Sequence, residues 1–394
     1  MKSDFYKYQA QTTPHPLGLE ISKAKGSYIY TTDGKAHLDF VAGVSANGLG
    51  HSHPKVVEAI KKQVDQYMHV MVYGEYVQKP AVEYTKLLAE CLPKPLKKTY
   101  LVNSGTEAID ASMKLARRFT GRSQIIAAKF CYHGNSFGAL SLMDYEERIK
   151  PFRPLIPDIT HIEFNNTNCF NCITTSTAAV IVETIQGGAG FIEPKDNYLK
   201  LLKQRCEAVG ALLILDEIQP GFGRTGKLFG FEHYKVIPDI LVIGKAMASG
   251  MPIGAFVASE TLMNTLSDKP KMSHITTFGG HPVIAAAAKA TLKTLLNSNL
   301  IAQTLEKEQL FRKLLQHELI EEVRGKGLML AIICKNPELA NHLVLEAQNR
   351  QLILFWLLYE KRAVRISPPL TISTDEIKKG CGIIIDVLNS YKPS

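Results

Sequence analysis

Short runs of continuous apolar residues alternate with amphipathic stretches through the middle of the chain. Between about residues 98 and 258 these runs are KTYLVN, QIIAAK, AAVIVET, ALLILDE and DILVIGK. Strands that are buried on both faces carry continuous rather than alternating apolar residues. The pattern therefore predicts an α/β fold whose large domain is built on a mostly parallel central sheet.

A helix with one apolar face is expected directly after Pro54. The run VVEAIKKQVDQYMHV repeats apolar residues at three- and four-residue spacing, namely Val57, Ile60, Val64, Tyr67 and Met68. We expect this face to pack on the core. A second helical run, VIAAAAKATLKTLLN, follows residue 282.

The two ends of the chain have a different pattern from the middle. Near the N-terminus, YIYTTDGKAHLDF alternates apolar and polar residues around Asp33-Gly34, a dipeptide that suits a tight hairpin turn. The tail from about residue 320 mixes short strands and helices. We expect residues 1–50 and 286–394 to pair into one small α+β domain, and residues 51–285 to form the large domain.

Composition and charge exclude several classes of partner. The 394 residues are 45% hydrophobic and 21% charged, with a net charge of +9 that is spread along the chain without a basic block. We therefore expect no nucleic-acid partner.

Neither a secretory signal nor an 18-residue apolar stretch is visible, so a cytoplasmic location and no membrane contact are expected. The seven cysteines favour a reducing compartment, and the CxxC at 169–172 lacks a second ligand pair, so no metal site is expected.

A strand followed by a helix places a small polar segment where anions bind. KTYLVN runs into Asn103-Ser104-Gly105-Thr106-Glu107 and then into the helical AIDASMKLARRF. Free backbone N–H groups at a helix N-terminus form a phosphate cradle. Ser104 with Glu107 three residues later equally fits a plain capping box, and the sequence around them leaves both interpretations open.

Asp216 ends ALLILDE, and a carboxylate at the carboxyl end of a buried parallel strand lies where doubly wound sheets bind ligands. A nucleotide triphosphatase would also need GxxxxGK[ST], which is absent. The GxGxxG at 221–226 follows Pro220 rather than a strand, so it does not predict dinucleotide binding.

Lys245 closes DILVIGK and is followed by the small residues of AMASGMPIGA. Burial lowers the pKa of an amine and supplies the neutral form that condenses with an aldehyde. A paired or snorkelling lysine is the alternative that this pattern leaves open.

Six motifs together resemble a known family. NSGTEA, YHGNS, LLILDEIQPGFGRTG, VIGKAMASGMPIGA, HITTFGGHP and VRISPPL occur in the order and approximate spacing of class III pyridoxal-phosphate-dependent aminotransferases, from about residue 18 to the C-terminus. The resemblance is greatest to the acetylornithine, ornithine and 4-aminobutyrate branch. It implies the type I aminotransferase fold, pyridoxal 5′-phosphate as cofactor, and a homodimer with active sites at the subunit interface. The implied reaction moves an amino group from an amino acid or ω-amine to a keto acid, with 2-oxoglutarate as the expected acceptor.

The resemblance also implies roles for residues around the cofactor ring. Lys245 matches the Schiff-base lysine and proton carrier, and Asp216 matches the partner of the pyridine nitrogen. A carboxylate beside that nitrogen favours its protonated form, which makes the ring an electron sink. Gln219 resembles the neighbour of the ring's 3-hydroxyl, and Tyr132 the aromatic residue stacked on the ring.

Other residues match family positions around the phosphate and the substrate. Those implied for the phosphate are Ser104, Gly105, Thr106 and Thr277 of the partner subunit. Thr276 matches a position near the substrate, and Glu183 one that lines the site. Arg365 in VRISPPL matches the arginine that takes a substrate carboxylate, a task that suits a planar bidentate donor.

The chain departs from the family pattern at the expected substrate end of the site. Asn135 stands where ornithine-type members usually have an arginine, and Gly188 where they usually have a glutamate that can pair with the carboxylate-binding arginine. His281 replaces a usual asparagine. Substrate identity therefore does not follow from the resemblance. A pyridoxal-phosphate-dependent aminomutase or decarboxylase is the alternative function, and a non-catalytic member of the fold would be expected to lack Lys245.

Overall fold

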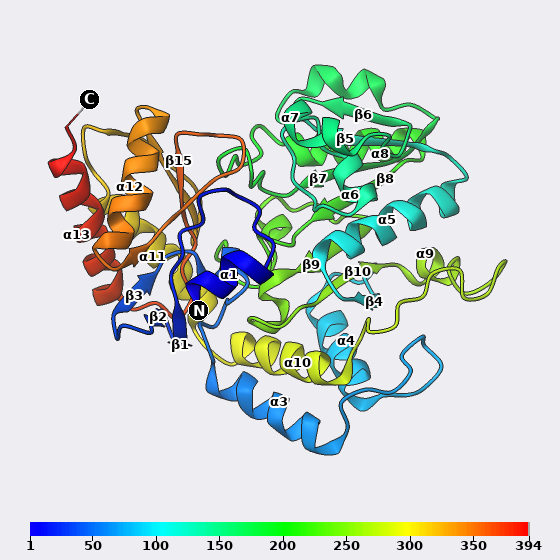
Figure 1. Cartoon of the computed structure of the whole chain (residues 1–394). Helices are drawn as coiled ribbons and strands as arrows, with labels where there is room; N and C mark the ends of the chain where they lie inside the picture. Colours follow the sequence, from blue (N-terminus) through cyan, green and yellow to red (C-terminus); the bar gives the residue numbers. More distant parts are fainter. Residues whose placement is uncertain (393–394) are drawn as a thin grey trace.

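A seven-stranded sheet forms the centre of the computed structural model, which describes residues 1–392 (Figure 1). Its strands, in spatial order, are β4 (Lys98–Val102), β10 (Gly254–Ala258), β9 (Ile240–Gly244), β8 (Leu212–Asp216), β7 (Thr177–Glu183), β5 (Gln124–Ala128) and β6 (Ile159–Ile162). Only β10 runs antiparallel to its neighbours β4 and β9. The predicted mostly parallel sheet is confirmed, and β6 and β10 are the two strands that the five apolar runs did not indicate.

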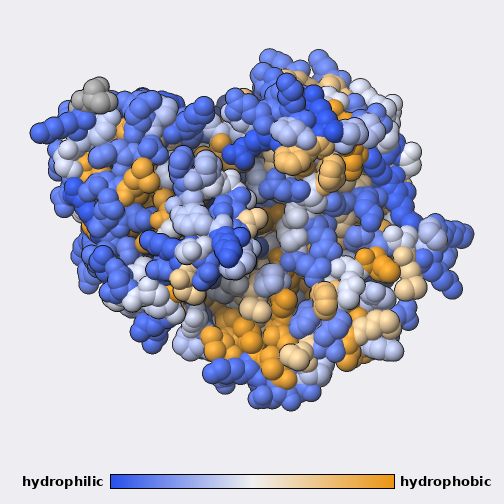
Figure 2. Space-filling view, in the orientation of Figure 1, coloured by the Kyte–Doolittle hydropathy of each residue, from blue (hydrophilic) through white to orange (hydrophobic). Residues whose placement is uncertain are grey.

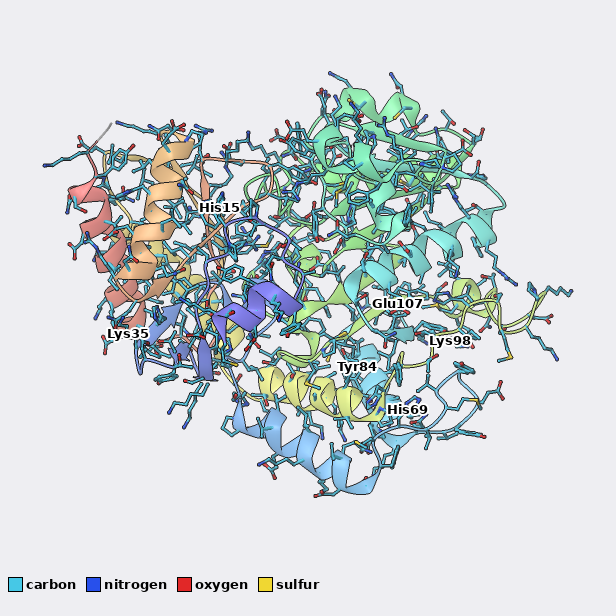
Figure 3. The ribbon with its side chains drawn as sticks, in the orientation of Figure 1. His15, Lys35, His69, Tyr84, Lys98 and Glu107 are labelled. Carbon is cyan, nitrogen blue, oxygen red and sulfur yellow. The ribbon has the colours of Figure 1, made fainter. Side chains whose placement is uncertain are left out.

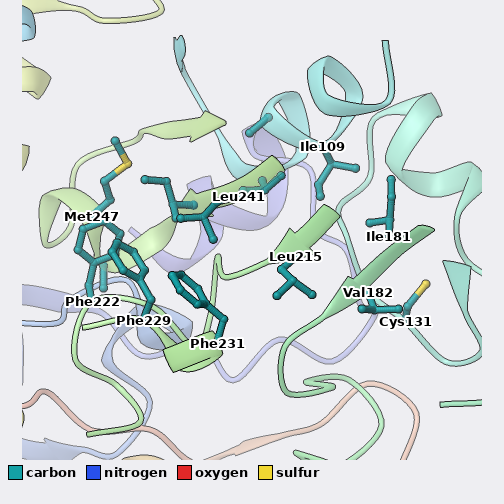
Figure 4. Packing of buried hydrophobic residues seen from close by; sticks show 14 of the residues in the cluster. Ile109, Cys131, Ile181, Val182, Leu215, Phe222, Phe229, Phe231, Leu241 and Met247 are labelled. Atoms are coloured by element: carbon teal, nitrogen blue, oxygen red, sulfur yellow. The ribbon is translucent and has the colours of Figure 1, made fainter. Parts of the chain in front are cut away.

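Helices cover this sheet and bury its continuous apolar runs. α5 (Gly105–Thr120) packs across β9 and β10, and α8 (Tyr198–Val209) packs against β7 and β8. Figure 4 shows part of the core, in which Ile109 of α5, Leu215 of β8 and Leu241 of β9 belong to one buried cluster. Burying each such side chain contributes about 1.5–3 kcal/mol, so the sheet is a rigid platform for residues at its edge.

The two ends of the chain build a second, smaller part of the molecule. One sheet contains β1 (Ile21–Lys25), β2 (Tyr28–Thr31), β3 (Ala36–Asp39) and β13 (Leu352–Ile353). A second contains β11 (Ile320–Lys326), β12 (Met329–Cys334), β15 (Ala363–Ile366) and β14 (Phe355–Trp356). The predicted hairpin is present, with Gly34 at a φ of +83° between β2 and β3. Because β13 pairs with β3, the N-terminal segment and the tail share a sheet.

Three helices of the tail pack together or against these small sheets. They are α11 (Leu300–Leu314), α12 (Pro337–Asn349) and α13 (Thr374–Ser390). Short helices occur elsewhere at α1 (Lys2–Tyr8), α2 (Ala42–Ser45), α6 (Phe137–Ser141), α7 (Glu146–Ile149) and α9 (Glu260–Asn264). Within residues 1–392, no helix has both the length and the apolarity that crossing a bilayer requires.

α3 (Pro54–Gln66), α4 (Lys79–Cys91) and α10 (Pro282–Leu296) pack together at the bottom of Figure 1. The predicted apolar face of α3 is only partly right. The helix ends at Gln66, Val64 is 42% exposed and Met68 is 63% exposed, while Val56 is buried. Figure 2 shows apolar surface over α10 and α3. Some apolar residues of this segment therefore pack in the core, and others lie on the surface of the single chain.

Candidate active site

A cavity of about 280 Å³ opens at the carboxyl ends of the parallel strands. Its lining comprises Gly105, Thr106, Tyr132, His133, Gly134, Asn135, Glu183, Asp216, Ile218, Gln219, Pro220 and Lys245. Glu183 and Asp216 are the last residues of β7 and β8, and Lys245 directly follows β9. Since parallel strands end at the same edge of the sheet, residues far apart in the sequence meet here.

The start of α5 forms one wall of the cavity. Ser104 is the N-cap, and its Oγ accepts a hydrogen bond from the Glu107 backbone N–H at 3.3 Å. The Glu107 carboxylate in turn accepts from the Asn103 backbone N–H at 2.7 Å. Figure 3 labels Glu107 at this helix end. Ser104 therefore caps the helix, although the Glu107 carboxylate bonds Asn103 rather than the cap itself as in a full capping box. Gly105 and Thr106 line the cavity, and the phosphate cradle stays a prediction that this geometry fits.

Two backbone segments approach the start of α5 so closely that only glycine fits at positions 134 and 254. Gly134 has a φ of +132°, and a Cβ added there would collide with the Thr106 side chain. A Cβ added to Gly254 would collide with the Ser104 carbonyl. The Ser136 backbone N–H donates to Thr106 Oγ1 at 3.0 Å, which fastens the 134–136 loop to α5. The result is a compact polar cradle at a helix N-terminus, suited to a phosphate group.

The carboxylate of Asp216 is held on both oxygens. Oδ1 accepts from the Ile218 backbone N–H at 2.9 Å, and Oδ2 lies 2.7 Å from Nδ1 of His133. Burial lowers the pKa of His133, but the neighbouring Cys131 and the hydrogen bond to Asp216 outweigh it and raise this pKa well above the ordinary value. His133 thus fixes the direction in which Asp216 presents its charge.

Glu183 is buried and braces two segments of the cavity wall. Its Oε1 accepts from the Gly187 backbone N–H at 2.9 Å, and its Oε2 accepts from the Tyr132 backbone N–H at 3.2 Å. Burial raises the pKa of Glu183 to about 7, with His133 opposing and Asp216 adding to the shift. The residue lines the cavity, and its two hydrogen bonds hold the backbone at Tyr132 and at Gly187 in place.

Lys245 lies in a backbone conformation that non-glycine residues rarely adopt. Its φ is +45°, at the start of the 3₁₀ turn Lys245–Ala248. The half-buried side chain lines the cavity, and burial lowers the pKa of its amine to about 8, although the negative charge of Asp216 opposes the shift. A strained position and a substantial neutral amine fraction near pH 8 are both typical of a reactive lysine.

Polar side chains line the rest of the cavity. Tyr132 is half-buried, and its hydroxyl accepts from Asn135 Nδ2 at 3.1 Å. Gln219 Nε2 donates to Ser45 Oγ at 3.4 Å. Ile218 packs so tightly on Gly105 that a Cβ there would lie 2.6 Å from its Cδ1. An apolar floor and an aromatic ring thus share the cavity with the amine and the carboxylate.

Four residues that were predicted for the site lie outside this cavity lining, namely Ser104, Thr276, Thr277 and Arg365. Arg365 of β15 is buried, with its guanidinium 5.4 Å from the Phe191 ring, and burial lowers its pKa to about 10. Thr276 Oγ1 accepts from Asn103 Nδ2 at 2.9 Å, one residue before the cap of α5. Thr277 is exposed, and its predicted role in a partner's site stays a prediction.

Sequence reasoning did not single out His133 or Arg224. Arg224 is buried in the 221–226 loop, where its Nη1 donates to the Leu328 carbonyl at 3.1 Å and to the Pro368 carbonyl. The loop therefore anchors the segment that carries Arg365, and it is followed by the 3₁₀ turn Gly230–His233 rather than by a nucleotide-binding helix. For Arg224, the only feature of the sequence that could have indicated a structural role is its position among the glycines of the 221–226 segment. His133 stands in the YHGNS motif, but the sequence analysis gave it no role.

A half-buried lysine and a carboxylate fixed by its neighbours share one cavity with a polar cradle at a helix N-terminus, on a mostly parallel sheet. These features define a pyridoxal-phosphate-dependent aminotransferase. The class-III aminotransferase family model matches residues 8–388, and the chain belongs to this family.

Curated relatives and solved structures agree with the family. The chain is 38% identical to the acetylornithine aminotransferase of Methanopyrus kandleri, over 93% of both chains. It is also 38% identical to the [LysW]-aminoadipate semialdehyde/glutamate semialdehyde transaminase of Sulfolobus acidocaldarius, over 80% of this chain and 81% of the relative. The ornithine aminotransferase of Toxoplasma gondii superposes with a TM-score of 0.91 at 28% identity, covering 99% of this chain and 95% of that structure.

Proposed function

We propose that the enzyme transfers an amino group from a carboxylate-bearing amine of the acetylornithine or ornithine type to a keto acid, with 2-oxoglutarate as the acceptor. The observation that carries the proposal is the meeting of Lys245, Asp216 and the α5 cradle in one cavity. Relatives named for acetylornithine and for semialdehyde transamination support the donor class. A buried arginine on the neighbouring β15 supports a carboxylate on the substrate.

The residues of the cavity fit pyridoxal phosphate, because a side chain at Gly134 or Gly254 would fill the cradle that the phosphate needs. Ser104, Gly105 and Thr106 would hold that phosphate, with Thr277 of the partner subunit. The bound cofactor supplies an electron sink for the carbanion left when a substrate proton departs.

Around the ring, each residue has a distinct proposed task. Lys245 would tether the cofactor and move the proton, which its lowered pKa favours. Asp216 would keep a proton on the ring nitrogen, oriented by the hydrogen bonds from His133 and Ile218. Tyr132 would stack on the ring, Gln219 would face the 3-hydroxyl group, and Glu183 would brace Tyr132 through its backbone N–H.

Three residues would face the substrate. Arg365 would bind a carboxylate through its buried guanidinium, whose Nε and Nη1 have no hydrogen-bond partner within residues 1–392. Asn135, which donates to the Tyr132 hydroxyl, and Thr276, which is tied to Asn103, would line the path of the donor.

We also propose a homodimer with shared active sites. Exposed large apolar residues cluster in two segments, and these residues are Val64, Met68, Val70, Met71, Tyr76, Val77, Val82, Met272, Ile275 and Phe278. His69 joins the segments, since its ring lies 4.8 Å from Phe278. An exposed apolar surface of this kind is typical of an interface, and Thr277 lies within it. We further propose the domain boundaries 1–50, 51–285 and 286–394.

A screen of amine donors tests the proposed reaction. Cofactor-loaded protein is mixed with single amines, and the loss of its visible absorbance is followed in a stopped-flow instrument. We expect carboxylate-bearing amines to bleach the band and 2-oxoglutarate to restore it, with pyruvate less effective. If no amine bleaches the band, transamination is wrong. Release of carbon dioxide, or turnover without a keto acid, would instead identify a decarboxylase or an aminomutase.

A further inference from the structure

Two half-buried cysteines, Cys169 and Cys172, lie in one short 3₁₀ turn between β6 and β7. The turn spans Thr167–Cys172. In a 3₁₀ helix the side chains of residues i and i+3 eclipse each other, and three residues rise by about 6 Å. The Cα atoms of a disulfide lie about 4.4–6.8 Å apart. The backbone of this turn therefore sets the two cysteines at a separation that a disulfide can span.

The thiol of Cys172 points back along the turn. Its Sγ donates a hydrogen bond to the Cys169 carbonyl oxygen at 2.9 Å. Burial raises the pKa of Cys172, the charge of Cys169 adds to this shift, and the charge of Arg205 opposes it. The Cys172 sulfur thus lies within electrostatic reach of both the Cys169 side chain and the Arg205 guanidinium.

Arg205 of α8 holds the backbone of this turn in place. Its Nε donates to the Phe170 carbonyl at 3.3 Å, and its Nη2 donates to the Ile173 carbonyl at 2.6 Å. Phe170 is buried, and its ring centroid lies 5.5 Å from that of Tyr198 in the same helix. Because the turn is anchored on both sides of Cys172, little conformational freedom is lost when its two sulfurs join.

The other cysteines form no comparable pair. No second CxxC occurs in the sequence. Among the remaining five, one is half-buried and four are buried, and these are Cys91, Cys131, Cys206, Cys334 and Cys381. An oxidant in solution therefore reaches the pair at 169 and 172 more readily than the buried thiols.

We propose that Cys169 and Cys172 form a reversible redox site, which a low-molecular-weight disulfide such as glutathione disulfide converts from dithiol to disulfide. The Cys169 thiolate attacks one sulfur of the oxidant, which forms a mixed disulfide and releases one glutathione thiolate. The Cys172 thiolate then attacks the Cys169 sulfur, closes the ring and releases the second glutathione. The two protons and two electrons of the protein thiols appear in two glutathione thiols, so the reaction balances.

The order of attack follows from the contacts of Cys172. Its thiol proton is held by the Cys169 carbonyl and its pKa is raised, so Cys169 reacts first. Once Cys169 is in the mixed disulfide, its charge no longer raises the pKa of Cys172, and Arg205 favours the attacking thiolate. The site is separate from the proposed aminotransferase reaction, because within residues 1–392 the active-site cavity is lined by no residue of this turn.

Mass spectrometric mapping of the full-length protein tests the redox site. Reduced protein is incubated with glutathione disulfide, alkylated, digested and mapped. We expect the wild-type peptide that holds both cysteines to lose two hydrogen atoms, with at least tenfold less of it carrying glutathione than disulfide. Reduced glutathione in excess should restore both thiols. A peptide that stays reduced, or that carries glutathione without closing the ring, overturns the inference.

Single-cysteine variants test the order of attack. C172S and C169S cannot close the ring, so each should keep one glutathione on the remaining cysteine of the turn. C172S should take it up at least tenfold faster, since it retains the cysteine that attacks first. C91S, which changes the half-buried cysteine of α4, is the control and should close as wild type does. Equal rates for C172S and C169S overturn the proposed order.

Arg205 variants test the anchoring of the turn. The equilibrium constant for ring closure is measured in buffers of varied glutathione and glutathione disulfide. R205Q should lower this constant at least tenfold, whereas K200Q, which changes an exposed lysine of the same helix, should leave it within twofold of wild type. Equal constants for R205Q and K200Q overturn the role of Arg205. If R205Q does not fold, R205K gives the second measurement, because it keeps the charge but loses the planar fork, and an unchanged constant overturns the role equally.

Discussion

At the scale of single residues, the amine of Lys245 should set the pH at which the apoprotein takes up its cofactor. Only the neutral amine condenses with an aldehyde, and its fraction rises with pH through the pKa. Because burial lowers this pKa to about 8, the rate of reconstitution with pyridoxal phosphate should reach half of its maximum near pH 8. In D216N the midpoint should fall, since the charge of Asp216 raises the pKa of Lys245. A rate that keeps rising to pH 10 would contradict this account.

The hydrogen bond from His133 to Asp216 leads to a second prediction at this scale. H133A removes a partner of a buried carboxylate at 2.7 Å and should lower kcat about 10- to 100-fold, in line with about 1.5–3 kcal/mol for a charged hydrogen bond. Its cofactor absorbance should also change, because Asp216 no longer presents its charge in a fixed direction. H161Q serves as the control, since the His161 ring bonds the Leu142 carbonyl at 3.0 Å and does not line the cavity. Equal activity of H133A and wild type would show that Asp216 needs no such support.

The positions of single residues were predicted best where a residue stands at the end of a continuous apolar run. Lys245 and Asp216 end continuous apolar runs, so the sequence indicated their place at the sheet edge. His133 was missed because its partner Asp216 lies 83 residues away, and no local spacing connects the two.

At the scale of elements, the closeness of β10 to the start of α5 should control cofactor binding. A Cβ at Gly254 would collide with the Ser104 carbonyl and lie 3.0 Å from the Gly105 nitrogen. G254A should therefore weaken pyridoxal-phosphate binding more than tenfold and lower the free energy of unfolding by about 1–3 kcal/mol. Calorimetric titration and thermal unfolding measure the two effects.

G382A is the matched control for that substitution. Gly382 lies in α13 with nothing within 4 Å of an added Cβ. The control should be neutral or stabilise the fold by about 0.5–1 kcal/mol, without changing cofactor affinity. Equal cofactor affinities for G254A and wild type would show that the cradle accommodates a Cβ at position 254 without losing the cofactor.

The apolar pattern predicted elements more reliably than it predicted their surroundings. Five continuous runs became strands of the central sheet because burial on both faces leaves few alternatives. β6 and β10 were not predicted, and in β10 Gly254 is required by its close approach to the Ser104 backbone rather than by hydrophobicity. The face of α3 was predicted as core, yet Val64 and Met68 are exposed in the single chain. Periodicity alone does not separate a core from an interface.

At the scale of the whole molecule, shared active sites should allow two impaired chains to complement each other. K245A lacks the tethering amine, and T277E puts a negative charge where Thr277 would meet a phosphate of the partner subunit's site. Each variant alone should be nearly inactive. After mixed refolding, activity should return to about a quarter of wild type, since about half of the dimers are mixed and each has one complete site. No recovery in a mixture proven to contain mixed dimers would contradict the sharing of sites.

The most direct test of the account concerns the cofactor's attachment point. Cofactor-saturated protein is reduced with borohydride, digested and mapped by mass spectrometry. We predict a single pyridoxyl adduct on the peptide that contains Lys245, and none in K245A. An adduct on another side chain of the saturated protein, or no adduct at all, would contradict the central claim.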